Sequence, residues 1–531
     1  MIRRKKRRGY MKKRVLATMM SIVLLLTAML SGCSVDSTEK DDNQIGTNAT
    51  ENYQGTGNDN VSYTGIKMSE DFKISEVDRA LYDNLFNINS EVRISIDIPK
   101  EEMIKIQKDY DKYSAFGSKS PIYRMCTMII EVDGEKYTIP EVGIRMKGNT
   151  SRRSFYDITS DTVYNLIHFK ISFTETFDDV EYYGKDAKVW TDEKARKERK
   201  DRTFASLEGL ELKWNRDLDA TYTRDTYAYK MYRDFGVLAP NNTLGTLEVN
   251  GKNWGVYKIH EPVDKIFLKR YFDEEDLGGD LYKCAWAGKN NANYTKVNGL
   301  AGIEDEDTGK FYPYDLKTNK TTSTHESLKN LVSTVKNTGN GKEEIEKVLD
   351  VDNWLKFLAV SYFLGMPDDL RNNYNNHYVY FKASTGQAVF IAYDCEICLG
   401  IDSWNPTGSY LTESNPYSGW AYGANQSQAN PLVKRIVSQG GLYTEEFKVV
   451  LDKVVNSKWI NANTFEVMYG ALAAKYEDDT DIDIDIPEFD ERLFTMSIDE
   501  TYKGQKINNN LTIVKFFSLM RDNYYAHRDL Q

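Results

Sequence analysis

The sequence predicts an α+β protein with two lobes, a strand-rich N-terminal lobe and a helix-rich C-terminal lobe. Apolar and polar residues alternate in segments between residues 92 and 173, which is typical of half-buried strands. Asp133-Gly134 and Asn250-Gly251 each separate two extended segments, and these dipeptides favour the tight turn of a β-hairpin. Beyond residue 323 the apolar residues recur mainly at helical spacing.

The first 32 residues are predicted to be a targeting segment. Basic residues at positions 3–8 and 12–14 precede an apolar run over 15–30, which is short for a membrane-spanning helix, and Leu30-Ser31-Gly32-Cys33 follows. This pattern resembles a bacterial lipoprotein signal, so we expect cleavage before Cys33 and a lipid on its thiol, which would hold the protein at the cell membrane, facing outside the cytoplasm. An uncleaved anchor would give the same location. Residues 33–60 are poor in aliphatic side chains and predict a disordered tether.

The charge of the mature chain narrows the choice of partners. Loss of residues 1–32 leaves 60 basic against 80 acidic residues, an excess of negative charge that excludes nonspecific nucleic-acid binding and favours basic partners. The four cysteines after Cys33 are too few for a disulfide scaffold in a chain of this size, so the fold must depend on a hydrophobic core.

The predicted elements divide the chain into a core over residues 82–400 and a helical C-terminal extension over 401–531. Strands are expected over 92–98, 127–132, 137–146 and 166–173, and helices over 203–212 and 220–235. Later helices are expected over 328–335, 354–364, 432–437, 445–454, 465–476 and 513–525.

One hairpin interrupts these helices and carries acidic residues at both ends. Strands over 378–382 and 388–393 flank Ser384-Thr385-Gly386, Asp368 and Asp369 precede them in an Asn-rich loop, and Asp394 follows them. Both ends open at the same sheet edge, where carboxylates and Asn carbonyls suit Mg²⁺ or Mn²⁺ and a carboxylate can accept a proton from a hydroxyl. The alternative is an Asx-turn beside a strand-end cap.

Three upstream features are candidates for phosphate or cofactor binding. The basic loop Lys147-Gly-Asn-Thr-Ser-Arg152 follows a strand and could hold phosphates, and the alternative, which the motif taken alone favours, is a surface turn. Lys170 lies among apolar residues in a strand, where it faces either an anion or solvent. Glu261 ends the strand after Asn250-Gly251 and could contact a lysine, a ribose or a metal, or act as an acid in the first turn of a helix.

Together these motifs resemble the spore-coat protein H (CotH) kinase family. The family pattern has a basic Gly-Asn-Ser/Thr-Ser-Arg loop, an Asn-Gly hairpin leading to a strand with Glu, and a closing Trp-Asp-x-Asp with a later Gly. Here they match Lys147-Gly-Asn-Thr-Ser-Arg152, the segment from Asn250-Gly251 to Glu261, and Tyr393-Asp394-Cys395-Glu396. Tyr393 and Glu396 differ from the family residues, but Glu also binds metal.

The resemblance implies an atypical bilobal protein-kinase-like fold that uses ATP and Mg²⁺ or Mn²⁺ to phosphorylate proteins, typically on Ser. It implies Asp394 as a metal ligand, Asp368 or Asp369 as the catalytic acid, and Asn376 or Asn373 as the second ligand, with Glu396 beside them. Lys147, Arg152 and Lys170 would neutralise phosphates.

The expected function is therefore an extracytoplasmic protein kinase acting on basic, Ser-rich proteins. Two alternatives remain. The first is a noncatalytic, pseudokinase-like surface module that binds cell-wall polymer or a partner protein. The second is a glycoside hydrolase that uses two carboxylates. The five His residues lack zinc-ligand spacing and no Gly-x-Ser-x-Gly motif is present, which disfavours zinc enzymes and serine hydrolases.

Overall fold

The computed structural model of the protein describes residues 65–114, 119–148, 151–216, 219–285, 292–295, 312–400, 414–418, 430–484, 501–502, 505–506 and 513–529. The expected signal segment, Cys33 and the tether lie outside these residues. Among the described residues, no helix combines the length and apolar character needed to cross a bilayer.

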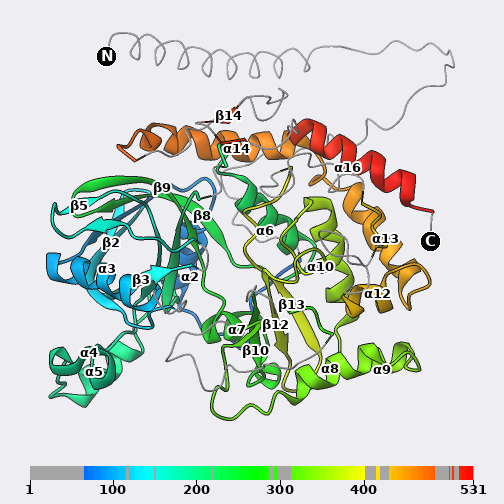
Figure 1. The fold of residues 1–531 in the computed structure, drawn as a ribbon, viewed down its shortest axis with the longest axis horizontal. Helices are drawn as coiled ribbons and strands as arrows, with labels where there is room; N and C mark the ends of the chain where they lie inside the picture. Colours follow the sequence, from blue (N-terminus) through cyan, green and yellow to red (C-terminus); the bar gives the residue numbers. More distant parts are fainter. Residues whose placement is uncertain are drawn as a thin grey trace, which may run out of the picture. The chain divides into compact units, whose positions relative to one another are not determined.

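Seven strands close into a barrel in the spatial order β1-β2-β3-β6-β7-β9-β8 (Figure 1). Neighbouring strands are antiparallel except β1 and β8, whose parallel pairing closes the barrel from Arg93–Thr246 to Ile96–Val249. The strands are β1 (Val92–Asp97), β2 (Arg124–Val132), β3 (Glu135–Lys147), β6 (His168–Ser172), β7 (Gly209–Trp214), β8 (Asn242–Val249) and β9 (Lys252–His260).

The barrel has its own hydrophobic interior. Val92, Ile94 and Ile96 alternate with more exposed residues along β1 and are almost fully buried, as the period of two requires. The β2–β3 and β8–β9 hairpins turn at Asp133-Gly134 and Asn250-Gly251, and all four residues have positive φ. Both turns therefore adopt the backbone that Asp-Gly and Asn-Gly favour, which confirms the two predicted hairpins.

A second, antiparallel sheet has the order β11-β10-β12-β13. Its strands are β10 (Leu281–Cys284), β11 (Tyr314–Leu316), β12 (His377–Phe381) and β13 (Ala388–Ala392). The β12–β13 hairpin confirms the two strands expected around Ser384-Thr385-Gly386. Asp368 and Asp394 therefore flank one hairpin, as the two strand-like runs around the turn predicted.

Helix α10 (Val351–Leu364) packs against this sheet and is almost wholly buried. Trp354 and Phe357 contact Phe390 of β13, with the Trp354 and Phe390 ring centroids 4.8 Å apart. The Asp350 side chain caps the first turn, and Gly365 ends the helix with a left-handed backbone. This helix fixes the sheet from which the acidic loops extend.

The other helices lie around and between these two parts (Figure 1). They are α2 (Glu76–Leu85), α3 (Lys100–Ser114), α4 (Val180–Tyr183), α5 (Glu193–Lys200), α6 (Arg224–Asp234), α7 (Lys265–Tyr271), α8 (Glu326–Lys336), α9 (Lys342–Glu346), α12 (Pro431–Ile436), α13 (Thr444–Val455), α14 (Ala462–Tyr476) and α16 (Ile513–His527). Short strand pairs form at β4 (Tyr156–Asp157) with β5 (Thr162–Val163) and at β14 (Thr501–Tyr502) with β15 (Gln505–Lys506).

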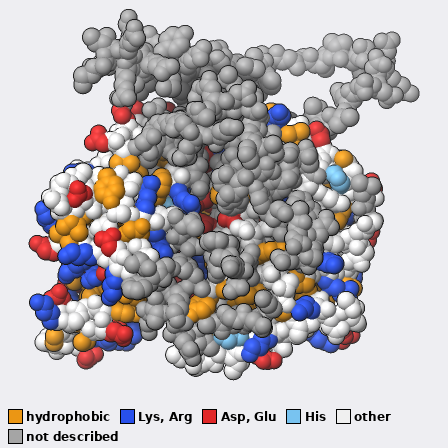
Figure 2. Space-filling view, in the orientation of Figure 1, with side chains coloured by type: hydrophobic (Ala, Val, Ile, Leu, Met, Phe, Trp, Pro, Cys, Tyr) orange, Lys and Arg blue, Asp and Glu red, His pale blue; other side chains and the backbone are white. Residues whose placement is uncertain are grey.

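The α+β prediction is confirmed, and the strand-rich part proves to be a closed barrel. The six helices expected beyond residue 323 are present as α8, α10, α12, α13, α14 and α16. The helix expected over 203–212 is wrong, because residues 209–214 form strand β7 between β6 and β9. Figure 2 shows Lys and Arg interspersed with Asp and Glu on the described surface.

Candidate functional site

A cleft of about 1110 Å³ brings together the barrel, the second sheet and both acidic loops. The barrel contributes residues of β3, β6 and β7, and the second sheet contributes Lys283 of β10. The loops contribute Asp368, Asn373, Asn376 and Asp394. Residues expected to bind phosphate and residues expected to bind metal therefore line the same space.

The barrel wall of the cleft consists of ionisable side chains from adjacent strands. Lys170 of β6 pairs in register with Arg145 of β3 on one side and with Glu211 of β7 on the other. Directly paired residues project to the same face of a sheet. Lys147 and Lys213 lie two residues further along their own strands and line the cleft as well.

Lys147 joins the barrel to the end of β13. Its ammonium lies 2.8 Å from the Tyr393 hydroxyl and 3.1 Å from Glu211 Oε2, and the same hydroxyl donates to Glu211 Oε2 at 3.1 Å. Burial raises the pKa of Glu211, but Lys147, Lys283 and other lysines outweigh that effect and hold its pKa well below the usual range. Glu211 is thus a buried anion that keeps Lys147 in place.

Lys213 contacts both acidic residues of the segment after β13. Its ammonium forms a short ion pair with Asp394 Oδ1 and lies 3.7 Å from Glu396 Oε2. Lys258 of β9 also lies 3.7 Å from that oxygen. Burial raises the pKa of Asp394, but Lys213 and Lys147 more than compensate, so its pKa is strongly lowered and the carboxylate stays ionised.

Asp394 adopts a backbone that few non-glycine residues tolerate. Its φ is +59°, in the left-handed region, and its N–H donates to the Tyr229 hydroxyl at 2.8 Å. Contacts with surrounding residues of the protein thus hold Asp394 in this conformation. The backbone leaves β13 in the direction of the cleft as a result. The Asp394 side chain is 33% exposed, whereas that of Lys213 is 2% exposed, so the carboxylate is the accessible member of the pair.

Asp368 lies on the opposite loop, held by two amides. Asn373 Nδ2 donates to Asp368 Oδ1 at 2.6 Å, and Asn376 Nδ2 donates to Asp368 Oδ2 at 2.9 Å. Burial raises the pKa of Asp368 to about 7, partly offset by these hydrogen bonds. Such a carboxyl group can exchange a proton near neutral pH. Asn373 and Asn376 thus both contact the carboxylate of Asp368.

The structure places Asp369 away from the cleft. It is almost fully buried, and it accepts hydrogen bonds from the Ser361 hydroxyl and, at 2.7 Å, from the Asn372 N–H. These contacts support the loop that presents Asp368. Of the two adjacent carboxylates, Asp368 is the one that faces the cleft.

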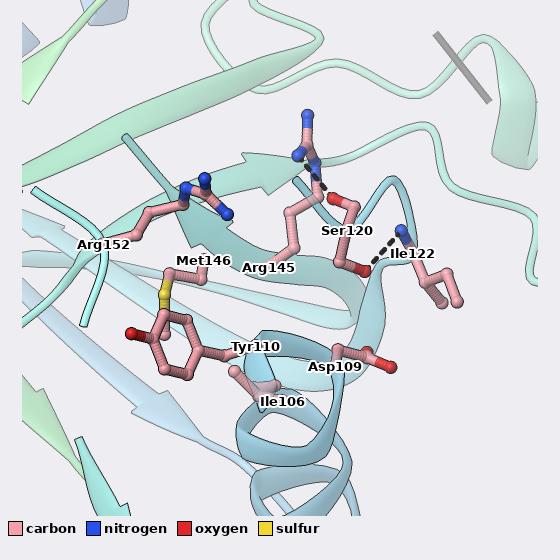
Figure 3. A pocket seen from close by; sticks show the side chains of 8 residues that line it. All are labelled: Ile106, Asp109, Tyr110, Ser120, Ile122, Arg145, Met146 and Arg152. Atoms are coloured by element: carbon pink, nitrogen blue, oxygen red, sulfur yellow. Dashed lines mark hydrogen bonds between the residues drawn. The ribbon is translucent and has the colours of Figure 1, made fainter. Parts of the chain in front are cut away.

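Two other expected residues also lie elsewhere. Arg152 lines a separate small cavity beside α3, with Tyr110 and Met146 (Figure 3). Glu261 is fully buried in an ion pair with Arg270, whose other terminal nitrogen donates to the Ser206 carbonyl at 2.9 Å. Of the basic residues expected at phosphates, Lys147 and Lys170 line the cleft.

The donors in the cleft fit Mg²⁺ or Mn²⁺ bound together with phosphates. Asp394 and Glu396 offer hard oxygens, and Glu396 Oε2 is buried without a hydrogen-bond donor among the described residues. Those residues include no group of three or more His, Cys, Asp or Glu placed to enclose a metal. Mg²⁺ is commonly held by one or two carboxylates plus substrate phosphates and water, which this arrangement matches.

Sequence reasoning missed Glu211, Lys213, Lys258 and Lys283. Glu211 and Lys213 alternate with leucines in Leu210-Glu-Leu-Lys213, a period-two signal that was available but was interpreted as a helix. Lys258 alternates with Tyr257 and Ile259 in β9, and Lys283 lies in the short strand β10, but neither pattern indicates which acid the lysine meets. Only the contacts between strands bring these residues to the acidic loops.

Comparison with known proteins identifies a matching family and a similar protein. The family described as CotH kinase protein matches residues 180–521. Inner spore coat protein H of Bacillus subtilis (strain 168) is 24% identical over 263 residues, which cover 49% of this chain and 64% of that protein. The chain thus matches less than two thirds of the length of this relative.

Proposed function

The chain belongs to the CotH kinase family, and on this premise we propose that it transfers phosphate from ATP to protein hydroxyls with the help of a divalent metal. The observation that carries the proposal is the meeting of Asp394, Asp368 and a group of buried lysines in one cleft. This combination suits phosphoryl transfer, because catalysis of that reaction depends mainly on positioning and on compensation of phosphate charge.

The lysines of the cleft supply the positive charge for the phosphates. Lys147 and Lys213 come from the barrel, and Lys283 comes from β10 on the other side. Lys283 lies 4.2 Å from the centre of the Tyr393 ring, so the three ammonium groups surround one aromatic side chain. Lys170 extends the positive charge along β6.

Asp368 is the residue suited to accept the proton of the attacking hydroxyl. It lines the cleft, and its pKa near 7 allows both protonation states at neutral pH. Asp394 and Glu396, with an oxygen of Asn373 or Asn376, would hold the metal. A bound Mg²⁺ or Mn²⁺ would neutralise charge that develops on the transferred phosphate.

Three further properties form part of this proposal. The barrel and the helix-covered sheet would act as the two lobes of an atypical kinase. The lipidated Cys33 would hold the protein at the outer face of the cell membrane. The acceptors would be basic proteins rich in Ser, consistent with the excess of acidic residues in the mature chain.

The test is transfer of labelled phosphate from ATP to basic Ser-rich peptides in the presence of Mn²⁺ or Mg²⁺. We expect transfer by the wild-type protein, and loss of at least about a hundredfold with Asp394→Ala. Transfer that does not exceed the Asp394→Ala background would contradict the proposal. Thermal stabilisation by ATP and metal without any transfer would instead indicate a binding module.

A further inference from the structure

Lys213 holds the same two carboxylates to which the proposed function assigns the metal. Its ammonium is paired with Asp394 Oδ1 and lies 3.7 Å from Glu396 Oε2. Together with Lys258, which lies 3.7 Å from the same Glu396 oxygen, Lys213 already balances the charge of the two acids. Lys213 is also almost fully buried, so water contributes little to the solvation of its charge.

The surroundings of Lys213 restrict where the ammonium can go. Lys213 is the penultimate residue of β7, just beyond the last residue that pairs with β6, and its register partner on β9 is Lys258, a second buried cation. Movement towards β9 would therefore bring two like charges together. The direction left open to the ammonium is towards the cleft, where the side chain of Asp394 is 33% exposed.

A divalent cation at Asp394 and Glu396 would meet the Lys213 ammonium at close range. Like charges repel strongly where burial lowers the local dielectric. The repulsion is relieved if another anion takes the ammonium, and a nucleotide phosphate in the same cleft supplies that anion. Lys147 is less available for this exchange, since Glu211 and the Tyr393 hydroxyl already hold it.

We infer that the Lys213 ammonium and the divalent cation compete for Asp394 and Glu396, so that cation binding requires a nucleotide phosphate that draws Lys213 away. Lys213 is then a positioning residue that couples the metal site to the nucleotide site. Because coupling between two sites is reciprocal, the metal must raise nucleotide affinity by the same factor. This inference rests on the proposed function, which places the metal at these acids.

The test measures protein-bound Mn²⁺ from the electron paramagnetic resonance signal of the free ion, with and without a nonhydrolysable ATP analogue. For the wild-type protein we expect the analogue to increase Mn²⁺ affinity by about tenfold or more, a typical coupling between sites. Lys213→Met should bind Mn²⁺ about tenfold more tightly than the wild type when no nucleotide is added, and should lose most of the coupling.

Two variants serve as controls. Lys213→Arg keeps the positive charge and should retain the weak Mn²⁺ binding of the wild type without nucleotide. Lys265→Met removes an exposed lysine that pairs with Glu208, and should leave Mn²⁺ affinity without nucleotide unchanged. If Lys213→Met does not fold, as judged by its melting curve, Lys213→Gln takes its place.

The outcomes separate this inference from the proposed function. Equal Mn²⁺ affinities for the wild type and Lys213→Met, with Mn²⁺ still bound at Asp394 as shown by loss of binding in Asp394→Asn, would overturn the inference alone. Coupling below about threefold in the wild-type protein would overturn it as well, whatever the variants show. Absence of Mn²⁺ binding with and without nucleotide in every variant would overturn the proposed function and this inference together.

Discussion

The Lys147 ammonium on the barrel lies 2.8 Å from the hydroxyl of Tyr393 at the end of β13, so the two halves of the cleft are joined by a hydrogen bond between a cation and a phenol. The hydroxyl in turn donates to Glu211 of β7. The position of the segment that carries Asp394 is therefore tied to the barrel through one side chain.

Removal of this hydroxyl should weaken the connection without removing the ring. We expect Tyr393→Phe to lower the free energy of unfolding by about 1 kcal/mol, the typical net value of a hydrogen bond, because the direct Lys147–Glu211 contact remains. Urea denaturation measures the change. The control is Tyr525→Phe on the surface, for which a shift within about 0.5 kcal/mol is expected, and equal losses in the two variants would contradict this role.

Asp368 and Asp369 should differ in what their loss affects. Asp368→Asn should reduce the rate of phosphate transfer by about a hundredfold or more, since it removes the proton acceptor that lines the cleft. Asp369→Asn should leave the transfer rate nearly unchanged, because Asp369 lies away from the cleft. Both variants should lower stability by about 1 kcal/mol, because an amide has one acceptor oxygen for two donors, which are Asn373 and Asn376 at position 368 and Ser361 and Asn372 at position 369. The reverse pattern would assign catalysis to Asp369.

Lys283 should make nucleotide affinity depend on pH. Burial, reinforced by repulsion from Lys147, lowers the pKa of Lys283 to about 7, so the side chain is charged below that pH and neutral above it. A triphosphate binds the charged form, and affinity for ATP should therefore fall as pH rises from 7 to 8.5, by at most about tenfold per pH unit.

A titration of ATP binding over pH 6.5–8.5 provides the measurement. Lys283→Met should bind more weakly at low pH and lose this dependence, while Lys283→Arg should stay charged and bind with little change over the range. Lys265→Met, a change at an exposed cleft lysine, is the control and should keep the wild-type slope. An unchanged slope in Lys283→Met would assign the dependence to another group.

Glu261 should stabilise the folded protein, because its carboxylate forms a fully buried ion pair with the guanidinium of Arg270. Glu261→Gln leaves the Arg270 guanidinium as a buried charge without its counter-ion, and should destabilise the protein by about 3 to 5 kcal/mol. Melting temperature gives the readout. In contrast, Asp352→Asn breaks an exposed pair with Lys356 and should cost less than about 1 kcal/mol. If Glu261→Gln loses little stability but binds ATP more weakly, the result would indicate that Glu261 belongs to the cofactor site.

Local patterns were enough to predict the hairpin that carries the acids. The short apolar and aromatic runs of β12 and β13 and the turn at Ser384-Thr385-Gly386 depend only on neighbouring residues, so Asp394 could be placed at a strand end. The β7 strand was missed for the opposite reason. Its extended form depends on pairing with β6 and β9, which overrides a local helical interpretation.

The role of each acidic and basic residue depends on its burial, and the spacing of residues in the sequence does not indicate burial. Asp368 and Asp369 are adjacent in sequence, yet Asp368 lines the cleft whereas Asp369 is buried and supports the loop. Glu261 and Glu211 both lie on barrel strands or at their ends, and Glu211 alone reaches the cleft. Which side of a loop faces solvent is decided by the packing around it.

By itself, the sequence determined the α+β class, the hairpins at Asp133-Gly134 and Asn250-Gly251, the later helices and the position of Asp394, because turns and periodicity are local properties of the chain. Only the tertiary structure decided that β1 closes a barrel against β8 and that Lys213 meets Asp394 and Glu396. Those contacts join residues separated by about 150 or more positions, and their energy comes from burial and charge compensation that exist only after the strands have assembled.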